Sequence, residues 1–276
     1  MDWLDNPAVQ GGIAPLVVGL VVGAALASTH RLGRTPLAWL GVTAAYAVTT
    51  YLATGLQLTP LTASRKVMLV TVAGALIGLA LDLGARRSAG LAALCLVAAA
   101  CATVWAFWSI VAQREGAASF GLAIGIASFA AVTVWLILSL ADDGMRAAAT
   151  GVGFGVATGV SAVVSASIGF LLSGMAIAAS CGALLIVQVL ARRDMPARFV
   201  AALSVGLPCA LFAVGAMLLA QMPWFVLPLL LLVPLALALI PLRALPPMAR
   251  AAALVAVALV VAVVPVAAAW LAARAS

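Results

Sequence analysis

The sequence carries very little charge. Only 8% of its 276 residues are Asp, Glu, Lys or Arg, and 67% belong to the apolar and aromatic set that includes cysteine. Soluble globular domains are about 45–50% apolar and about 25% charged, so this composition excludes a soluble enzyme, a disordered protein and a fibrous repeat. With a mean hydropathy of +1.29, the chain is predicted to be a polytopic membrane protein.

Residues that carry buried chemistry are also scarce. His30 is the single histidine, which excludes bis-histidine haem ligation and metal sites built from several histidines. A Ser-His-Asp hydrolase would need His30 at the end of a helix, and the sequence has no nucleophile elbow. Four cysteines lie in apolar segments without CxxC spacing and are interpreted as small apolar fillers; they are Cys95, Cys101, Cys181 and Cys209. The sequence therefore predicts no catalytic residue, no metal site and no cofactor, and the protein is not expected to be an enzyme.

The net charge of +7 comes from 13 arginines and one lysine, Lys66, against seven acids. These basic residues occur singly or in small clusters between apolar runs, so no continuous stripe could follow a nucleic-acid backbone. An excess of basic residues between spans is instead typical of cytoplasmic loops. We expect a lipid bilayer as the main partner and no nucleic acid. Other membrane subunits, or further copies of the chain, are the remaining candidate partners.

Charged and turn-forming residues divide the chain into apolar runs of about 20 residues, the length of a bilayer-spanning helix. The expected fold is an all-α polytopic membrane helix bundle in a single domain, 1–276. About ten transmembrane helices form five hairpins with short loops. They cover 9–28, 36–56, 65–83, 89–112, 118–140, 170–191, 199–219, 224–242 and 251–271, with one more from 147 to a tight turn near 167–169. Pro228 and Pro234 remove hydrogen bonds within 224–242 and can kink that helix.

The basic residues also predict an orientation. Ten arginines lie in the loops after the odd-numbered helices, whereas four basic residues lie on the other side. The positive-inside rule places the arginine-rich side in the cytoplasm. The expected location is the inner (plasma) membrane of a bacterium, with both termini in the periplasm.

An internal repeat is a further hypothesis. Shifting the chain by about 162 residues brings Arg31 and Gln57 near Arg193 and Gln221, which indicates a parallel repeat of 9–112 and 170–272, as in many transporters. A five-fold repeat of the hairpin fits the loop pattern equally well.

Uncharged polar residues form a stripe on the helix predicted over 36–56. Thr43, Tyr46, Thr50 and Gln57 recur at spacings of three, four and seven residues, which places them within a sector of about 60°. Such a stripe avoids lipid, so it faces either a neighbouring helix or a hydrated path for a solute. Both interpretations stay open, and the four residues are candidates for a substrate path.

The helix that begins at 147 has two adjoining sectors of small residues. One has glycine at every fourth position, the spacing that lets two helix backbones touch, and it predicts helix packing; its members are Gly151, Gly155 and Gly159. The other sector carries hydroxyl groups, which either bond to their own helix or line a solute path; its members are Thr158, Ser161 and Ser165.

A few charged residues lie near predicted helix ends. Arg65 and Lys66 occupy the outer side, against the overall charge bias. They are expected either to anchor the helix at the interface or to form an outer anion site or partner contact. Asp82 has Arg86 four residues later, a spacing that predicts an ion pair on one helix face.

Two functions fit this pattern. The first is a transporter or permease for a small neutral or weakly polar solute, with the two polar helices along the route. The lack of acids within the spans argues against proton coupling through the chain's own side chains. The alternative is a non-catalytic membrane-embedded scaffold or anchor subunit of a larger membrane complex, which the short loops and small-residue faces also support.

Overall fold

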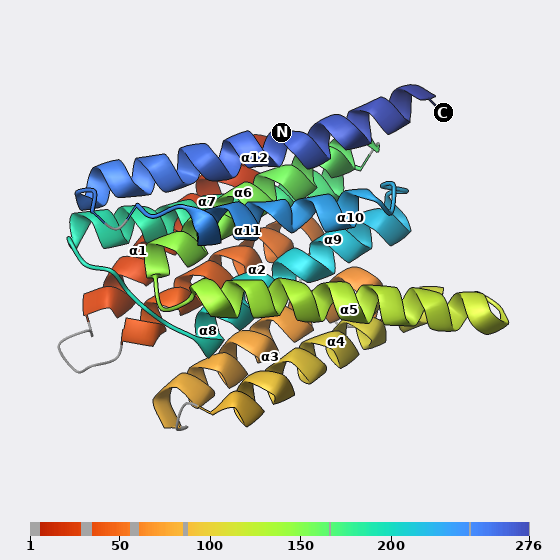
Figure 1. Ribbon diagram of the computed structural model, residues 1–276, viewed down its shortest axis with the longest axis horizontal. Coiled ribbons are helices and arrows are strands. Elements are labelled where there is room, and N and C mark those ends of the chain that lie inside the picture. The colour runs from red at the N-terminus through yellow and green to blue at the C-terminus, as the bar shows by residue number, and fades with distance from the viewer. Residues whose placement is uncertain are drawn as a thin grey trace.

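The computed structural model describes residues 6–28, 35–55, 61–84, 88–165, 167–242 and 244–275. Over these ranges the chain forms helices and connecting turns without a β-strand (Figure 1). The prediction of an all-α polytopic membrane helix bundle is confirmed.

Eight helices in the described ranges are long and apolar enough to cross a bilayer. The first joins a π-helical turn, η2 (Val9–Ile13), to α1 (Ala14–Ala27). The seventh joins α8 (Phe199–Ala201), the π-helical turn η5 (Ala202–Gly206) and α9 (Leu207–Leu219). The others are α3 (Ala63–Gly84), α4 (Ala89–Val111), α5 (Gly116–Leu140), α6 (Gly144–Val164), α7 (Ile168–Leu190) and α12 (Pro247–Ala275). Their limits lie within a few residues of eight predicted spans.

The other two predicted spans are shorter helices. The segment expected over 36–56 is a 3-10 turn, η4 (Thr35–Trp39), followed by α2 (Leu40–Thr54). The segment expected over 224–242 is divided into α10 (Val226–Leu230) and α11 (Leu232–Leu239). Pro234 has no N–H to donate to the carbonyl four residues earlier, so the helical ladder is interrupted. The 15 residues of α2 cover about 23 Å at about 1.5 Å per residue, less than the hydrocarbon core of about 30 Å.

The centre of the bundle is formed by α6, α7 and the segment Phe199–Leu219. In the most apolar 18-residue stretch of each helix, 78% of the residues are buried in α6 and 83% in Phe199–Leu219. The corresponding share is 28% in each of α3, α4 and α12. α12 covers one side of the bundle, and α3, α4 and α5 lie on the opposite side (Figure 1). The outer helices expose large apolar side chains such as Leu94 and Val260, which suits surfaces that face lipid.

α6 and α7 pack with their backbones in contact. A Cβ atom built on Gly155 would lie 2.5 Å from the carbonyl oxygen of Gly174, and one built on Gly174 would lie 2.8 Å from the Cα atom of Gly159. A side chain does not fit between these backbones, so both helices depend on glycine here. The structure thus places Gly155 and Gly159 of the predicted stripe against α7, and Gly151 faces Cys181, which is also on α7.

Candidate functional site

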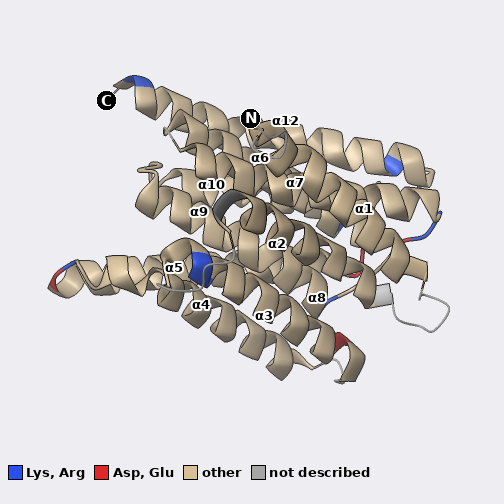
Figure 2. Cartoon of the chain, turned by 180° about the vertical axis from the view of Figure 1, so that it is seen from behind, with Lys and Arg blue, Asp and Glu red and all other residues tan. Residues whose placement is uncertain are grey.

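Polar groups gather at two opposite ends of the bundle. At one end, α2 and α9 finish, α3 and α7 begin, and these elements surround a cavity. At the other end, α6 and α12 begin and α11 finishes, and a network of charged and polar side chains joins them. Most of the helical length between the ends carries no Lys, Arg, Asp or Glu (Figure 2).

The cavity has a volume of about 170 Å³ and is partly open. It is lined by Tyr46, Thr49, Thr50, Ala63, Ser64, Val67, Phe107, Ser167, Gly169, Phe170, Leu172, Ser173, Phe212 and Leu219. None of these described lining residues carries a charge. The described lining therefore offers hydrogen bonds and apolar contact but no counter-charge.

Hydroxyl groups of α2 and α7 form part of the wall. Thr49 Oγ1 donates to the Ala45 carbonyl at 3.1 Å, and Ser173 Oγ donates to the Gly169 carbonyl at 3.1 Å. These bonds satisfy the hydroxyl protons within their own helices, as the membrane interior requires. A hydroxyl oxygen that donates its proton still has lone pairs that can accept a hydrogen bond.

Four aromatic rings belong to the apolar part of the wall. The rings of Tyr46 and Phe212 meet edge to face, with centroids 5.2 Å apart and an interplanar angle of 68°. The rings of Phe107 and Phe170 both lie against Gly215: a Cβ atom there would be 2.7 Å from Phe170 Cε1 and 3.3 Å from Phe107 Cζ. Glycine at position 215 therefore lets α9 approach both rings.

The structure brings two of the four residues of the predicted α2 stripe to this cavity. Tyr46 and Thr50 line it, and Thr50 Oγ1 donates to the Tyr46 carbonyl at 3.0 Å. Thr43 is buried earlier on the same helix and is not among the described lining residues. Gln57 lies outside the described residues, so its predicted place on the path is not described.

The predicted hydroxyl sector of α6 lies elsewhere. Thr158 and Ser161 are buried, and Ser165 Oγ donates to the Ser161 carbonyl at 3.3 Å. None of the three belongs to the described lining of the cavity. Because α6 packs against α7, α9, α11 and α12, its polar sector faces neighbouring helices.

The basic pair on α3 follows the lining residue Ser64. Lys66 Nζ lies 5.1 Å from the centroid of the Trp105 ring, within the range of a cation–π interaction. Trp105 is 48% exposed on the outer surface of α4. Neither Arg65 nor Lys66 is among the described lining residues, and their role as an outer anion site or partner contact stays a prediction.

Sequence reasoning missed much of the lining. Thr49 is adjacent to Thr50 but lies about 100° away around the helix, so a search for one narrow polar stripe passes over it. The rings of Phe107, Phe170 and Phe212 come from three helices. Periodicity within one helix contains no signal that they meet.

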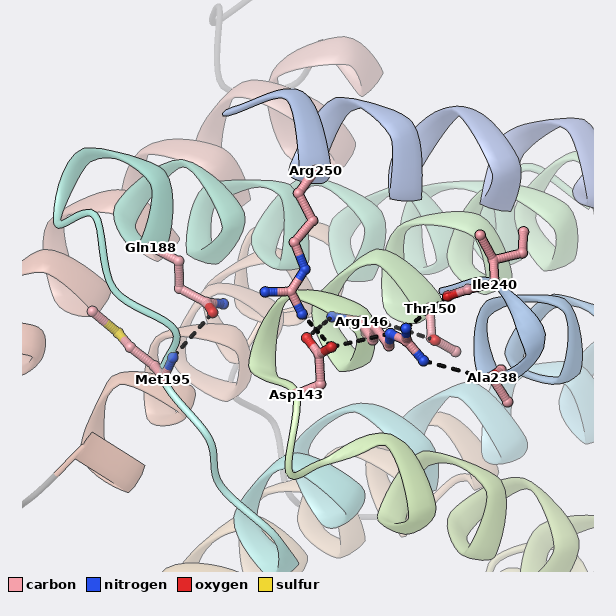
Figure 3. Close-up of polar contacts among 8 residues, drawn as sticks. All are labelled: Asp143, Arg146, Thr150, Gln188, Met195, Ala238, Ile240 and Arg250. Carbon is pink, nitrogen blue, oxygen red and sulfur yellow. Dashed lines mark hydrogen bonds and ion pairs between the residues drawn. The ribbon is translucent and has the colours of Figure 1, made fainter. Parts of the chain in front are cut away.

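Asp143 is the centre of the network at the other end (Figure 3). It caps α6, because its Oδ1 accepts the backbone N–H of Arg146 at 3.2 Å. Its Oδ2 lies 3.0 Å from Arg146 Nε and also accepts a short hydrogen bond from Arg250. Arg146 donates in addition to the carbonyls of Ala238 and Ile240, at 3.3 and 2.6 Å. One buried carboxylate thus joins α6 to α12, and Arg146 binds the C-terminal end of α11.

The connection between α7 and α8 packs against this network. The Met195 N–H donates to Gln188 Oε1 at 3.2 Å, and the Met195 carbonyl accepts Trp39 Nε1 at 3.0 Å. Trp39 is fully buried. These bonds fix the connection to α7 and to the start of α2.

Asp194 in the same connection faces the first turn of α6, where its Oδ1 would lie 2.8 Å from a Cβ atom built on Gly144. Partial burial and the nearby Asp143 carboxylate raise the pKa of Asp194 above its ordinary value of 3.8, while Arg250 and the backbone N–H groups of Gly144 and Met145 act in the opposite direction. Two carboxylates therefore lie at the N-terminus of α6, where the helix dipole favours negative charge.

Asp82 has a role that the sequence did not predict. Its two carboxylate oxygens accept the backbone N–H groups of Phe199 and Val200, at 3.1 and 2.9 Å, so Asp82 holds the start of α8 in the manner of a capping residue. Arg86 lies outside the described residues, and the predicted ion pair is not described.

Among the residues that the structure describes, no three His, Cys, Asp or Glu side chains form a group that could hold a metal ion. No model of a protein family matches the chain, and no curated protein matches it.

Proposed function

We propose that the chain is a permease for a small neutral or weakly polar solute, which binds in the cavity between α2, α7 and α9. The observation that carries this proposal is a partly open cavity with hydroxyl and aromatic walls inside a multi-pass membrane protein. Small-molecule sites are typically apolar hollows with a few placed polar groups, often between helices of a bundle.

The size and lining of the cavity restrict the solute. An apolar cavity of about 150 Å³ holds one benzene molecule, so a volume of about 170 Å³ accommodates a molecule of similar size. A charged solute would need a buried counter-charge, and the described lining provides none.

The distribution of basic residues supports an orientation with the cavity outside. The end that holds the Asp143 network also carries Arg192, Arg193 and Arg198, whereas Arg65 and Lys66 lie towards the cavity end. The positive-inside rule then favours the cytoplasm for the network end. We place the protein in the bacterial inner membrane, with the cavity and both termini towards the periplasm.

Flux through purified protein tests the proposal. Proteoliposomes and empty liposomes are exposed to gradients of urea, glycerol and nicotinamide, and solute entry is followed by stopped-flow light scattering. We expect at least one solute to enter the proteoliposomes faster. Equal rates in both preparations for every solute would contradict a permease.

Two matched variants connect the flux to the cavity. Thr50→Leu replaces a lining hydroxyl with a larger apolar group, so it should reduce the flux strongly. Ser139→Leu makes a similar change on the exposed face of α5 and should leave the flux unchanged. If the two variants behave alike, the cavity is not on the route.

A scaffold or anchor subunit is the second candidate, because α5 has an uncovered small-residue face. A Cβ atom added to Gly121 or Gly125 would have no neighbour within 4 Å in the described chain. An apolar groove of about 480 Å³ beside them reaches Trp224 and Pro228. Such faces are typical of helix association in membranes. Extraction in mild detergent followed by mass spectrometry separates the two: a stoichiometric partner subunit favours the scaffold, and a chain that migrates alone contradicts it.

A further inference from the structure

The walls of the cavity contain more information about its ligand than neutrality alone. Aromatic rings approach it from four helices: Tyr46 from α2, Phe107 from α4, Phe170 from α7 and Phe212 from α9. Flat rings pack well against other rings, edge to face or offset. A molecule with a flat apolar body therefore packs against these walls better than a flexible polyol, which has no ring.

Two of the hydroxyl groups of the described lining have a definite polarity. Thr49 and Ser173 each donate their proton to a carbonyl of their own helix, both at 3.1 Å. Because the proton of each group is used in this bond, each oxygen is free only to accept a hydrogen bond from a ligand. A ligand that presents an N–H or O–H donor matches these oxygens, whereas a ligand with acceptors alone does not.

The volume sets the size. The cavity volume of about 170 Å³ is slightly larger than the cavity of about 150 Å³ that one benzene molecule fills. One six-membered ring with one small substituent fills this space.

We propose that the cavity binds a single small uncharged aromatic ring that carries a hydrogen-bond donor, with phenol as the simplest member of the class. This inference rests on the proposed function, since it takes the same cavity as the solute site. The ring lies among the four aromatic side chains, and the donor group bonds to the oxygen of Thr49.

Binding is tested on the full chain in lipid nanodiscs, with empty nanodiscs subtracted, by saturation-transfer NMR. The probes are phenol, anisole and glycerol. Anisole keeps the ring and the oxygen of phenol but has no donor, and glycerol has donors but no ring. We expect saturable binding of phenol, binding of anisole that is weaker by about threefold to tenfold, the usual effect of one hydrogen bond, and no saturable binding of glycerol.

A matched pair of variants assigns the donor contact. Thr49→Val keeps the shape of the wall and removes the acceptor, so phenol should bind about threefold to tenfold more weakly while anisole is unaffected. Thr133 on α5 is equally buried and donates to the Phe129 carbonyl at 2.8 Å, but it is not a described lining residue. Thr133→Val should therefore leave the binding of both probes unchanged.

The outcomes separate this inference from the permease proposal. Failure of phenol to bind saturably, equal binding of phenol and anisole to the wild type, or equal effects of Thr49→Val and Thr133→Val would overturn the ligand class, even if Thr50→Leu still stops flux. Binding as expected, combined with no flux of any solute, would support the ligand class and contradict the permease. Comparing the three probes on the wild type tests the inference even if Thr49→Val fails to fold.

Discussion

Replacing Asp143 with asparagine should destabilise the bundle strongly. The Asp143 side chain is 4% exposed, and its partners Arg146 and Arg250 are 11% and 13% exposed. Asparagine has nearly the same shape but no charge, so both guanidinium groups would stay buried without their counter-ion. Removing one partner of a buried ion pair costs about 3–5 kcal/mol.

The surroundings of the two arginines place the expected cost near the lower end of that range. Arg146 keeps its hydrogen bonds to the carbonyls of Ala238 and Ile240, and the Asp194 carboxylate remains near Arg250. We expect a loss of about 3 kcal/mol, which is about a hundredfold change in the unfolding equilibrium constant.

The neighbouring aspartate provides the control. Asp142 is 58% exposed and lies 3.6 Å from Arg198 Nε, so Asp142→Asn should cost no more than about 1 kcal/mol. Unfolding is measured by SDS titration in mixed micelles, followed by circular dichroism. In a double-mutant cycle, Asp143→Asn with Arg250→Gln should cost less than the sum of the single changes. Equal effects at positions 142 and 143, or strict additivity in the cycle, would refute the role of the buried carboxylate.

Three further changes test other contacts. Gly155→Ala should cost about 1–3 kcal/mol or more in the same SDS titration, because its Cβ would meet the Gly174 backbone. Gly121→Ala is the control and should be neutral or slightly stabilising, since nothing in the described chain lies within 4 Å of the added Cβ. Equal effects of the two changes would contradict the α6–α7 contact. Asp82→Ala should cost about 0.5–2 kcal/mol, as loss of a cap does, and faster hydrogen exchange confined to the start of α8 would identify the cause. The raised pKa of Asp194 means that the folded state binds the proton more tightly than the unfolded state. The contribution of this group to the free energy of unfolding therefore decreases as pH rises from about 3.8 through the raised value. The stability of Asp194→Asn, measured against pH, should lack that decrease.

The membrane-spanning helices could be predicted from the sequence because hydrocarbon imposes a length and a composition on each of them. That argument fails where proline acts on hydrogen bonding rather than on hydropathy. The run over 224–242 is apolar throughout, yet it forms two short helices around Pro228 and Pro234. Hydropathy detects an apolar segment but does not show that its helical ladder is interrupted.

Two of the described lining residues of the cavity could be predicted as well. Tyr46 and Thr50 share one face of α2, and a face with two polar groups is unfavourable towards lipid. The same reasoning selected Thr158 and Ser161, which lie outside the described lining. Helical periodicity identifies residues on a common face, but α6 is surrounded by protein, so its polar face is covered by neighbouring helices rather than by an open space.

Only the contact between Asp143 and Arg146 in the charged network could be predicted from the sequence. Asp143 and Arg146 are three residues apart, a spacing that favours contact on a helix. Arg250 is 107 positions from Asp143, and Asp82 is 117 positions from Phe199. Such contacts depend on which helix ends meet, and a single sequence does not contain that information.

Hydroxyl groups within these helices show why polarity alone does not mark a solute path. Thr49, Thr103 and Thr133 each donate to the carbonyl four residues earlier, at 3.1, 2.8 and 2.8 Å, and this bond satisfies the hydroxyl proton within the helix. By that measure the three are equivalent, and only Thr49 lines the cavity. What distinguishes it is the cavity that the surrounding rings leave beside it. A polar residue in a membrane helix therefore indicates a binding site when its neighbours from other helices leave room beside it, and indicates packing when they do not.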